Sequence, residues 1–414
     1  MKILYVASGI PVPGSVGGST HVIEVCRGLA ALGHELLAVV GPQQGDAPVF
    51  DPQAPIRLVQ LPQRPELALT TLPTVWRQAR QFRPDVVMER YYNLAGAGLL
   101  YAHRHGLPSL LEVNAPLYDP PGSRKDRLDR ASGRPLRRWA RWQARVADRI
   151  VTPLAMTAGA LARPGTIVEL PWGANTDLFD PARLDPAEVT AIRATLGLPP
   201  PGAAEVVVFS GSFRPWHGVE TLLVAARELL PHRPRLRLLL IGDGPERAAL
   251  EATVRAWGEL GRRVIFTGRL PYDAVPRHLA LADLGVAPFE PDRHAALRHF
   301  GFYWSPLKIF EYGAMGLPTV CPAIPPLDAI VREGREGRLY RVGDAAALAV
   351  TLAGLLDDAP ARHAMGAQAR ARVVREFSWA AHCRSLDRVL RDAVASQHHD
   401  DHAASPRAPE SPHA

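Results

Sequence analysis

The chain has 414 residues, of which 47% are hydrophobic and 21% are charged, and a net charge of +7. This length suits two ordinary domains, and the composition is that of a soluble globular protein. No run of eighteen apolar residues occurs, so we expect no membrane-spanning helix. The apolar start at 2–7 breaks at Gly9 and Pro11, which favours a buried first strand over a signal peptide.

Short apolar runs alternate with helical patterns along the chain, in two series. Apolar strands separated by helices predict a parallel sheet that is covered on both faces. Two such series predict an α/β protein built from two doubly wound, Rossmann-like domains. The strands are expected at 2–7, 35–41, 56–61, 85–89, 108–113, 149–152 and 167–170, and then at 205–211, 236–241, 263–267, 284–288, 318–321 and 337–340. The helices are expected at 19–32, 67–82, 94–105, 218–230, 246–259, 273–281, 306–315, 344–356 and 378–394.

The break between the two series lies near Pro171, where weakly patterned sequence begins. We therefore expect an N-terminal domain at 1–172 and a C-terminal domain at 173–377. A last helix at 378–395 is expected to pack back towards the N-terminal domain. Residues 396–414 are rich in histidine, proline and serine, which is typical of a disordered tail.

The basic residues are concentrated between Arg124 and Arg149, where ten of them face only three acidic residues. Apolar side chains are interleaved with them. Two interpretations stay open: a solvated helix whose arginine stems cover apolar surface, or a basic amphipathic helix on an anionic membrane surface. No nucleic-acid recognition motif accompanies the charge, so we expect no nucleic-acid partner.

The cysteines Cys26, Cys321 and Cys383 are odd in number, far apart and without metal-ligand spacing. This usage fits a reducing cytoplasm, where the protein is either free or peripheral at the inner face of the membrane.

The most informative stretch of the chain runs from Ser305 to Thr319 and predicts a loop, a short helix and the start of a strand. Pro306 suits the first helical turn, and Gly316 suits the helix end. Lys308 and Glu311 are three residues apart and therefore lie on one helix face. A helix N-terminus can hold a phosphate, and a carboxylate can accept hydrogen bonds from two ribose hydroxyls. One helix could thus bind both halves of a nucleotide, with Ser305, Pro306 and Leu307 at its phosphate end.

Two glycine-containing loops follow predicted strands, at the edge where ligands of parallel sheets bind. After the first strand, Gly17 and Gly18 allow a close approach of backbone to ligand, although a flexible turn explains them equally well. The neighbouring His21 is expected to be a surface residue. After the strand at 205–211, Arg214 and His217 follow a turn with Ser212.

Arg214 and His217 can serve a diphosphate; the alternative is a surface arginine and a histidine that caps the helix. Arg214 can bind it bidentately, and His217 can donate a hydrogen bond and, when protonated, add a second charge.

Two further strand ends carry candidate residues. Gly268, Arg269 and Leu270 follow the strand at 263–267, where backbone groups could contact a base. In the N-terminal domain, Glu89-Arg90-Tyr91 follows a strand and is expected to face the ligand edge, where it could bind an acceptor. A structural ion pair is an equally good interpretation of this triplet.

The C-terminal series of motifs resembles glycosyltransferase family 4. The resemblance rests on Gly211…Gly218, on Ile241-Gly242-Asp243-Gly244-Pro245, on Thr267-Gly268-Arg269 and on Lys308…Glu311…Gly316-Leu317-Pro318, in order from about Leu170 to Phe377. It implies a GT-B fold, with two Rossmann-like domains that face each other across a cleft. It also implies a nucleotide-sugar donor, UDP- or GDP-linked, held mainly by the C-terminal domain. The transfer would proceed with retention at the anomeric carbon, without a catalytic metal or other cofactor, to an acceptor that is a glycan, a lipid-linked group or a small metabolite.

The chain departs from the family pattern at three places. Ser212 and His217 stand where the family usually has an arginine and a lysine, and Arg214 is a candidate replacement for the missing charge. Tyr303 stands in place of a first family glutamate. Asn114 stands where many members keep a histidine; asparagine cannot accept a proton, although it can orient a hydroxyl. The resemblance gives the catalytic set Arg214, His217 and Lys308, and it makes Asn114 an acceptor-side residue.

These departures keep a second hypothesis open, namely a degenerate GT-B protein that binds a nucleotide or a partner without catalysis. A third hypothesis, a sugar-nucleotide epimerase of similar architecture, requires an acid–base pair that the sequence does not offer.

Overall fold

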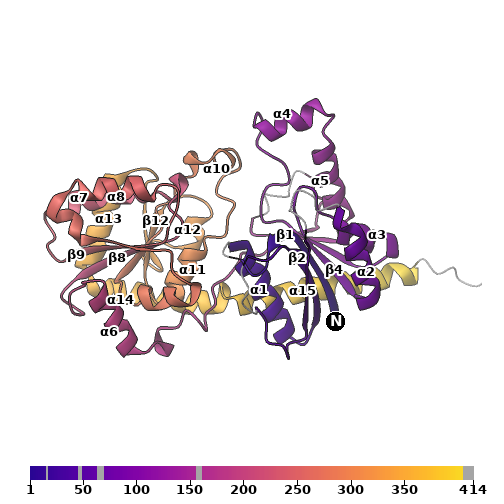
Figure 1. Cartoon of the computed structure of the whole chain (residues 1–414), viewed down its shortest axis with the longest axis horizontal. Helices are drawn as coiled ribbons and strands as arrows, with labels where there is room; N and C mark the ends of the chain where they lie inside the picture. The colour runs from indigo at the N-terminus through magenta and orange to yellow at the C-terminus, as the bar shows by residue number, and fades with distance from the viewer. Residues whose placement is uncertain (15–16, 45–48, 63–69, 155–160, 404–414) are drawn as a thin grey trace, which may run out of the picture. The chain divides into compact units, whose positions relative to one another are not determined.

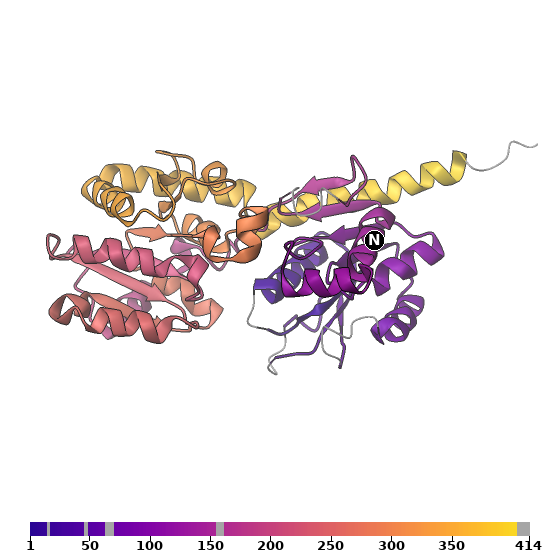
Figure 2. The same cartoon turned by 90° about the horizontal axis from the view of Figure 1, so that it is seen from above.

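The computed structural model describes residues 1–14, 17–44, 49–62, 70–154 and 161–403, and it consists of two compact units. Unit 1 comprises Met1–Pro171 and the chain from His382 onward, and unit 2 comprises Trp172–Ala381. In each unit, helices cover both faces of a central sheet (Figures 1 and 2). Every strand pair of the two sheets is parallel, and the predicted fold class of two doubly wound α/β sheets is confirmed.

Unit 1 contains a seven-stranded sheet in the order β3-β2-β1-β4-β5-β6-β7. Its central strands are mostly apolar and, apart from Lys2 at the start of β1, have no exposed residue on either face, which is why they could be predicted from sequence. The strands are β1 (Lys2–Pro11), β2 (Glu35–Gly41), β3 (Ile56–Gln60), β4 (Val86–Arg90), β5 (Ser109–Glu112), β6 (Arg149–Thr152) and β7 (Ile167–Glu169). The helices are α1 (Gly17–Ala31), α2 (Leu72–Phe82), α3 (Ala97–His105), α4 (Arg124–Ala131) and α5 (Pro135–Val146).

Unit 2 contains a six-stranded sheet in the order β10-β9-β8-β11-β12-β13. One apolar cluster joins the sheet to α7, α8 and α13 and contains Phe209, Phe213 and Leu222, all of them fully buried. The strands are β8 (Glu205–Ser210), β9 (Leu236–Ile241), β10 (Val264–Gly268), β11 (Leu284–Val286), β12 (Thr319–Pro322) and β13 (Gly337–Tyr340). The α-helices are α6 (Pro186–Thr195), α7 (Val219–Leu229), α8 (Arg247–Arg255), α9 (Val275–Leu279), α10 (Ala295–Phe300), α11 (Leu307–Ala314), α12 (Leu327–Ile330), α13 (Ala345–Asp357) and α14 (Ala359–Glu376).

The last helix, α15 (Trp379–Ala403), begins in unit 2 and continues along unit 1. Within unit 1, His34 Nε2 lies 2.8 Å from Asp387 Oδ1, and His382 Nδ1 lies 2.9 Å from the Pro171 carbonyl. The helix extends to Ala403, so residues 396–403, expected to be disordered, are helical. The sequence from Trp379 to Ser405 contains no proline or glycine, which explains the extension. The rest of the expected tail, from 404, lies outside the described residues.

The strand order reverses between β1 and β4 in unit 1 and between β8 and β11 in unit 2. At such a switch point, the loops after the two strands diverge to opposite faces and leave a crevice at the carboxyl edge of the sheet. Candidate ligand-binding residues should therefore lie after β1 and β4, and after β8 and β11. Within the described part of the chain, no helix is both long and apolar enough to cross a membrane.

Candidate functional site

The switch point of unit 2 brings together the loop after β8, the loop after β11 and the helix α11. The loop after β8 turns sharply back at Gly218, whose φ is +66°. A Cβ atom at this position would lie 1.7 Å from the Pro288 carbonyl oxygen, so only glycine fits between the two loops. Close packing of the loops thus requires the glycine that the sequence carries there.

Helix α11 supplies the two charged residues that the sequence singled out. Pro306 is the residue before the helix rather than part of its first turn, and Gly316 follows the helix with a φ of +72°. Lys308 and Glu311 are only 8% and 9% exposed. Burial lowers the pKa of Lys308 to about 7 and raises that of Glu311 to about 7, while each charge opposes the shift of the other. Displaced pKa values of this kind make Lys308 and Glu311 candidates for a functional site.

Glu311 is connected to the loop that follows β10. The hydroxyl of Tyr272 donates a hydrogen bond to the Glu311 carboxylate, which favours its ionised form. Tyr272 comes directly after Gly268, Arg269, Leu270 and Pro271. Gly268 has a φ of +75°, and Arg269 is exposed. The predicted base-contact loop and the predicted ribose carboxylate therefore lie side by side in the structure.

His217, in the loop after β8, does not carry a positive charge. His217 Nδ1 lies 2.5 Å from the Ser212 carbonyl oxygen, which can only accept, so Nδ1 carries the proton. Burial, with added repulsion from Lys308 and Arg214, lowers the pKa of His217 to about 2. His217 therefore does not meet the condition for a second positive charge near neutral pH: its ring is taken out of water beside two cations, which favours the neutral form. Arg214 is exposed, and its guanidinium lies 5.3 Å from the centre of the Trp216 ring.

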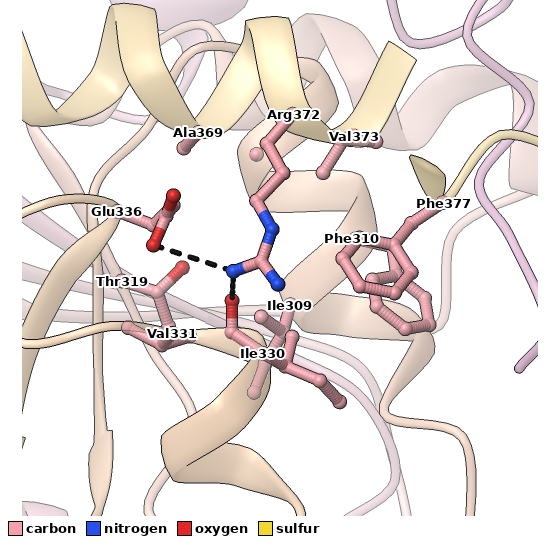
Figure 3. Close-up of a pocket in the computed structure, with 11 residues that line it drawn as sticks. Ile309, Phe310, Thr319, Ile330, Val331, Glu336, Ala369, Arg372, Val373 and Phe377 are labelled. Atoms are coloured by element: carbon pink, nitrogen blue, oxygen red, sulfur yellow. Dashed lines mark hydrogen bonds and ion pairs between the residues drawn. The ribbon is translucent and has the colours of Figure 1, made fainter. Parts of the chain in front are cut away.

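The opposite face of α11 is firmly anchored (Figure 3). Phe310 stacks on Phe377 with ring centres 4.8 Å apart. Arg372 donates to the Ile330 carbonyl at 2.8 Å and lies 3.4 Å from Glu336. The space between these residues is only about 10 Å³, enough for about one water molecule. Such packing holds α11 rigid, which positions Lys308 and Glu311 for a ligand.

The predicted phosphate end of α11 is partly occupied by local contacts. The backbone N–H of Leu307 donates to the Ser305 carbonyl, and that of Ile309 donates to the Pro306 carbonyl. The Ser305 hydroxyl oxygen accepts from the backbone N–H of Trp172 at 3.0 Å. The Lys308 side chain is therefore the stronger candidate for anion binding at this end of the helix.

A second polar cluster lies at the switch point of unit 1. Arg90, the last residue of β4, donates to Glu112 at 3.0 Å and to His21 Nδ1 at 2.9 Å. Tyr5 of β1 donates to the other Glu112 oxygen at 2.5 Å. The Asn114 amide also donates to Glu112, which fixes the orientation of that amide. These contacts bring the predicted acceptor-side residues Arg90 and Asn114 together.

His21 is not the surface residue that was expected, because its side chain is only 1% exposed. It lies in the first turns of α1, and Gly17 and Gly18 are the first residues of that helix rather than a preceding loop. A Cβ atom on Gly18 would lie 3.5 Å from Arg90 Nη2. Close packing of α1 against Arg90 therefore explains why His21 and Gly18 belong to the buried cluster.

Glu89 does not face the ligand edge as expected. It is fully buried and accepts from the backbone N–H groups of Gly96, Gly98 and Leu99 at the start of α3. Burial raises its pKa to about 8 in spite of these bonds. Its partners are backbone groups, so it caps a helix rather than forming an ion pair. The neighbouring Tyr91 donates to the Leu117 carbonyl at 2.8 Å.

Several residues near the two switch points were not predicted from sequence. In unit 1 these are Tyr5 and Glu112; the position of Glu112 as the last residue of a buried strand was an available signal. In unit 2 they are aromatic side chains around Lys308 and His217, which come from different loops and share no local pattern. This aromatic set comprises Phe209, Trp216 and Phe289.

A larger depression of about 360 Å³ lies elsewhere on unit 2, between the end of α8 and the start of β10. It is away from the carboxyl edge of the sheet and contains none of the candidate residues. Among the described residues, no three histidine, cysteine, aspartate or glutamate side chains gather as metal ligands would.

Comparison with known proteins identifies both units. A model described as "Glycosyltransferase Family 4" matches residues 16–178, and one described as "Glycosyl transferases group 1" matches residues 204–358. A D-inositol 3-phosphate glycosyltransferase from Corynebacterium aurimucosum is 29% identical, over 95% of each chain. A 2-deoxystreptamine glucosyltransferase from Streptomyces kanamyceticus is 32% identical over 46% of this chain and 49% of its own.

Solved structures show the same fold. The Anabaena protein HepE in complex with UDP aligns with a TM-score of 0.68 and 20% identity, covering 95% of this chain and 100% of its own. A sucrose-phosphate synthase from Thermosynechococcus elongatus aligns with a TM-score of 0.72 and 21% identity, covering 95% and 99%. With the two family models matched in order and relatives aligned over nearly the whole length, the chain belongs to glycosyltransferase family 4 and is a glycosyltransferase of GT-B fold.

Proposed function

We propose that the protein transfers a sugar from a UDP- or GDP-linked donor to an acceptor, with retention at the anomeric carbon and without a catalytic metal. The observation that carries this proposal is the pair Lys308 and Glu311 on α11. Both are buried at the switch point of unit 2, and Lys308 Nζ has no hydrogen-bond partner among the described residues. A buried amine and a buried carboxylate on one helix face match the diphosphate and the ribose of a nucleotide sugar.

The division of the donor site follows from the neighbours of these two residues. Glu311, beside Tyr272 and the Gly268–Leu270 loop, would hold the ribose hydroxyls, with the base against the loop. Lys308 and Arg214 would hold the diphosphate. The departing nucleoside diphosphate carries the negative charge that develops during transfer, and fixed cations stabilise it most effectively. Two such side chains support a transfer that does not depend on a metal ion.

The polar cluster of unit 1 is the proposed acceptor side. Asn114 is partly exposed, while Arg90 and Glu112 beneath it are buried. An asparagine held in one orientation can direct an acceptor hydroxyl but cannot take its proton. We propose that the departing diphosphate takes that proton, as a front-face retaining transfer allows. Because the relative from Corynebacterium acts on D-inositol 3-phosphate, this compound is the first acceptor to test.

The test of the donor assignment is titration calorimetry with UDP, GDP, UDP-glucose and GDP-mannose. Glu311→Ala is expected to weaken binding of the preferred donor by about tenfold or more, because two ribose hydrogen bonds are lost. Glu259→Ala, at a side chain that is 80% exposed in the same unit, is the matched control. An unchanged affinity of Glu311→Ala would refute the ribose assignment.

Catalysis is tested separately, by product formation with the preferred donor. Activity that persists in EDTA supports metal independence, and the anomeric coupling in the ¹H NMR spectrum of the product reports retention or inversion. The competing function, a GT-B protein that binds without catalysis, is favoured by two observations: His217 is neutral, and Asn114 cannot act as a base. Tight donor binding without transfer or donor hydrolysis would support that alternative.

We also propose that unit 1 docks to anionic membranes through α4 and α5, at the cytoplasmic face. The acidic residues there are engaged: Asp129 accepts from the backbone N–H of Leu136 at 2.8 Å, and Asp126 pairs with Arg130. The basic side chains remain largely exposed, and Leu128 on α4 is 61% exposed. Exposed cations around an apolar side chain favour anionic lipid. The buried free thiols of the three cysteines suit a reducing compartment.

Flotation with phosphatidylglycerol vesicles at low and high salt tests this docking. Combined Arg124→Glu, Lys125→Glu and Arg127→Glu substitutions should abolish flotation. Arg255→Glu and Arg262→Glu, exposed sites on unit 2, are the control. Flotation that is equal at low and high salt, or that persists in the α4 variant, would contradict the proposal.

A further inference from the structure

The Lys308 ammonium is held by aromatic rings rather than by a carboxylate. Its Nζ lies 3.9 Å from the centre of the Phe209 ring and 4.8 Å from that of Phe289. Phe209 is in β8, and Phe289 follows β11, so the two rings come from the two sides of the switch point. A Cβ atom on Gly211 would lie 2.9 Å from Nζ, which shows how closely the amine approaches the loop after β8.

This arrangement keeps the charge available to a ligand. The π faces attract an ammonium and fix its position, but they do not neutralise it. A carboxylate partner would neutralise the ammonium, and an anionic ligand would have to displace that carboxylate. The amine has no hydrogen-bond partner within the described ranges. It is therefore a positioned donor that can turn to an incoming phosphate without breaking an existing bond.

The loop after β8 contributes a neutral group beside this cation. The His217 ring lies 6.4 Å from the Phe209 ring and 5.6 Å from the Phe289 ring, so it packs against the same two aromatic side chains as Lys308. With Nδ1 donating to the Ser212 carbonyl, the other ring nitrogen, Nε2, has a lone pair and no proton. Nε2 can accept a hydrogen bond from a hydroxyl, and it cannot donate one to a phosphate oxygen.

Two sets of residues lie near Lys308. Glu311 is one turn further along α11 and accepts a hydrogen bond from Tyr272. His217 packs against the two rings that hold Lys308, and the ring centre of its neighbour Trp216 is 6.0 Å from that of Trp304. If the ribose lies at Glu311 and the diphosphate at Lys308, we expect the sugar beside this second set. Aromatic faces and a hydroxyl acceptor are groups that pack against and orient a neutral pyranose.

We propose that the buried positive charge of the diphosphate site comes from α11, as the Lys308 ammonium between the Phe209 and Phe289 rings, and that neutral His217 accepts a hydrogen bond from a hydroxyl of the transferred sugar. This inference rests on the proposed nucleotide-sugar function. It assigns the buried cation to the helix, and it gives the loop after β8 a sugar-specificity role instead of a second buried charge.

The experiment compares the affinities of a nucleoside diphosphate and its sugar conjugate, using UDP with UDP-glucose and GDP with GDP-mannose. If the wild-type protein binds neither pair, the proposed function fails. If it binds one pair, that pair is used with the variants Lys308→Met, Lys308→Gln and His217→Phe, after thermal unfolding has shown that each is folded. The expected pattern is distinct for the two residues.

Both Lys308 variants should bind the nucleoside diphosphate and its sugar conjugate about 10- to 100-fold more weakly, the loss typical of one charged hydrogen bond. His217→Phe should leave the affinity for the diphosphate within about threefold of the wild-type value. The same variant should bind the sugar conjugate about tenfold more weakly than the wild type does. His217→Gln, which restores an acceptor, should recover most of that loss. Wild-type diphosphate affinity in both Lys308 variants would overturn the helix assignment. Equal losses for diphosphate and sugar conjugate in His217→Phe would overturn the sugar contact.

A charge relocation provides a second, independent test. In Lys308→Met/His217→Lys, the ammonium moves from the helix to the loop while the rings remain. If the site needs one cation between these rings, the double variant should bind the diphosphate at least tenfold more tightly than Lys308→Met alone. No gain would contradict the assignment of a cation beside the Phe209 and Phe289 rings to the diphosphate.

Discussion

Donor binding should take up a proton above neutral pH. Burial lowers the pKa of Lys308 to about 7, so in the free protein its amine is mostly uncharged at pH 8. A diphosphate beside Nζ stabilises the ammonium and raises that pKa again. Protonation of Lys308 must then accompany binding, and the affinity for the donor must fall as the pH rises.

The magnitude follows from the fraction of Lys308 that is protonated before binding. With a pKa of about 7 in the free protein and one well above 9 in the complex, binding at pH 8 takes up about 0.9 proton. From about pH 7.5 to about pH 8.5 the affinity should fall about eightfold. Glu311, whose pKa is also about 7, is largely ionised in this window and adds little to the slope.

Calorimetry in two buffers of different ionisation enthalpy measures the proton count directly. UDP-glucose or GDP-mannose is preferable to the free diphosphate, whose terminal phosphate titrates near neutral pH. Lys308→Arg is the matched control, because its guanidinium stays charged throughout and should remove both the uptake and the slope. A wild-type affinity that stays constant from pH 7.5 to 8.5, with no proton uptake, would refute this account of Lys308.

Three further outcomes test the local geometry. Gly211→Ala should weaken donor binding about tenfold in calorimetry, because the new methyl group, 2.9 Å from Lys308 Nζ, displaces the amine; unchanged affinity would contradict this. Glu89→Ala should lower the free energy of unfolding by about 2–3 kcal/mol in urea titrations, since three buried N–H groups lose their acceptor, while donor affinity stays the same. Lys308→Met should raise the free energy of unfolding at pH 7. Between about pH 7 and about pH 10.5, Lys308 is protonated in the unfolded wild-type chain but not in the folded one, so the wild type gains stability as the pH rises. The advantage of Lys308→Met over the wild type should therefore shrink towards about pH 10.5. A pH-independent difference would show that Lys308 is not a buried titrating group.

The strands, and their alternation with helices, were predictable because each strand is marked by its own local sequence. The run at 205–210, for example, is apolar and buried on both faces, so its sequence alone marks it as a central parallel strand. Helix α14 was not among the predicted helices. Its sequence is rich in alanine and arginine, and its buried side includes Arg362, so no clear apolar stripe marks it.

The candidate site was predictable only where its residues share one element. Lys308 and Glu311 lie on one short helix, so their spacing revealed them. The protonation state of His217 depends on burial by Phe289 and on repulsion from Lys308. Phe289 lies in the loop after β11 and Lys308 lies on α11, both far from His217 in the sequence. The role of Glu89 depends on α3 folding back over the end of β4. Both are properties of long-range packing, and no local pattern encodes them.

The energetics of α11 connect the fold to the function. An amine that is taken out of water without a hydrogen-bond partner costs stability, and so does a carboxylate whose pKa is raised to about 7. Methionine and glutamine would remove both costs on the same helix. The opposite face of α11 has no such stability cost: Phe310 stacks on Phe377, and Arg372 pairs with Glu336. A destabilising face and a tightly packed opposite face are what a preorganised binding site requires, since the ligand, not the fold, satisfies the buried charges. The destabilising residues of α11 are therefore the ones to which donor binding is assigned.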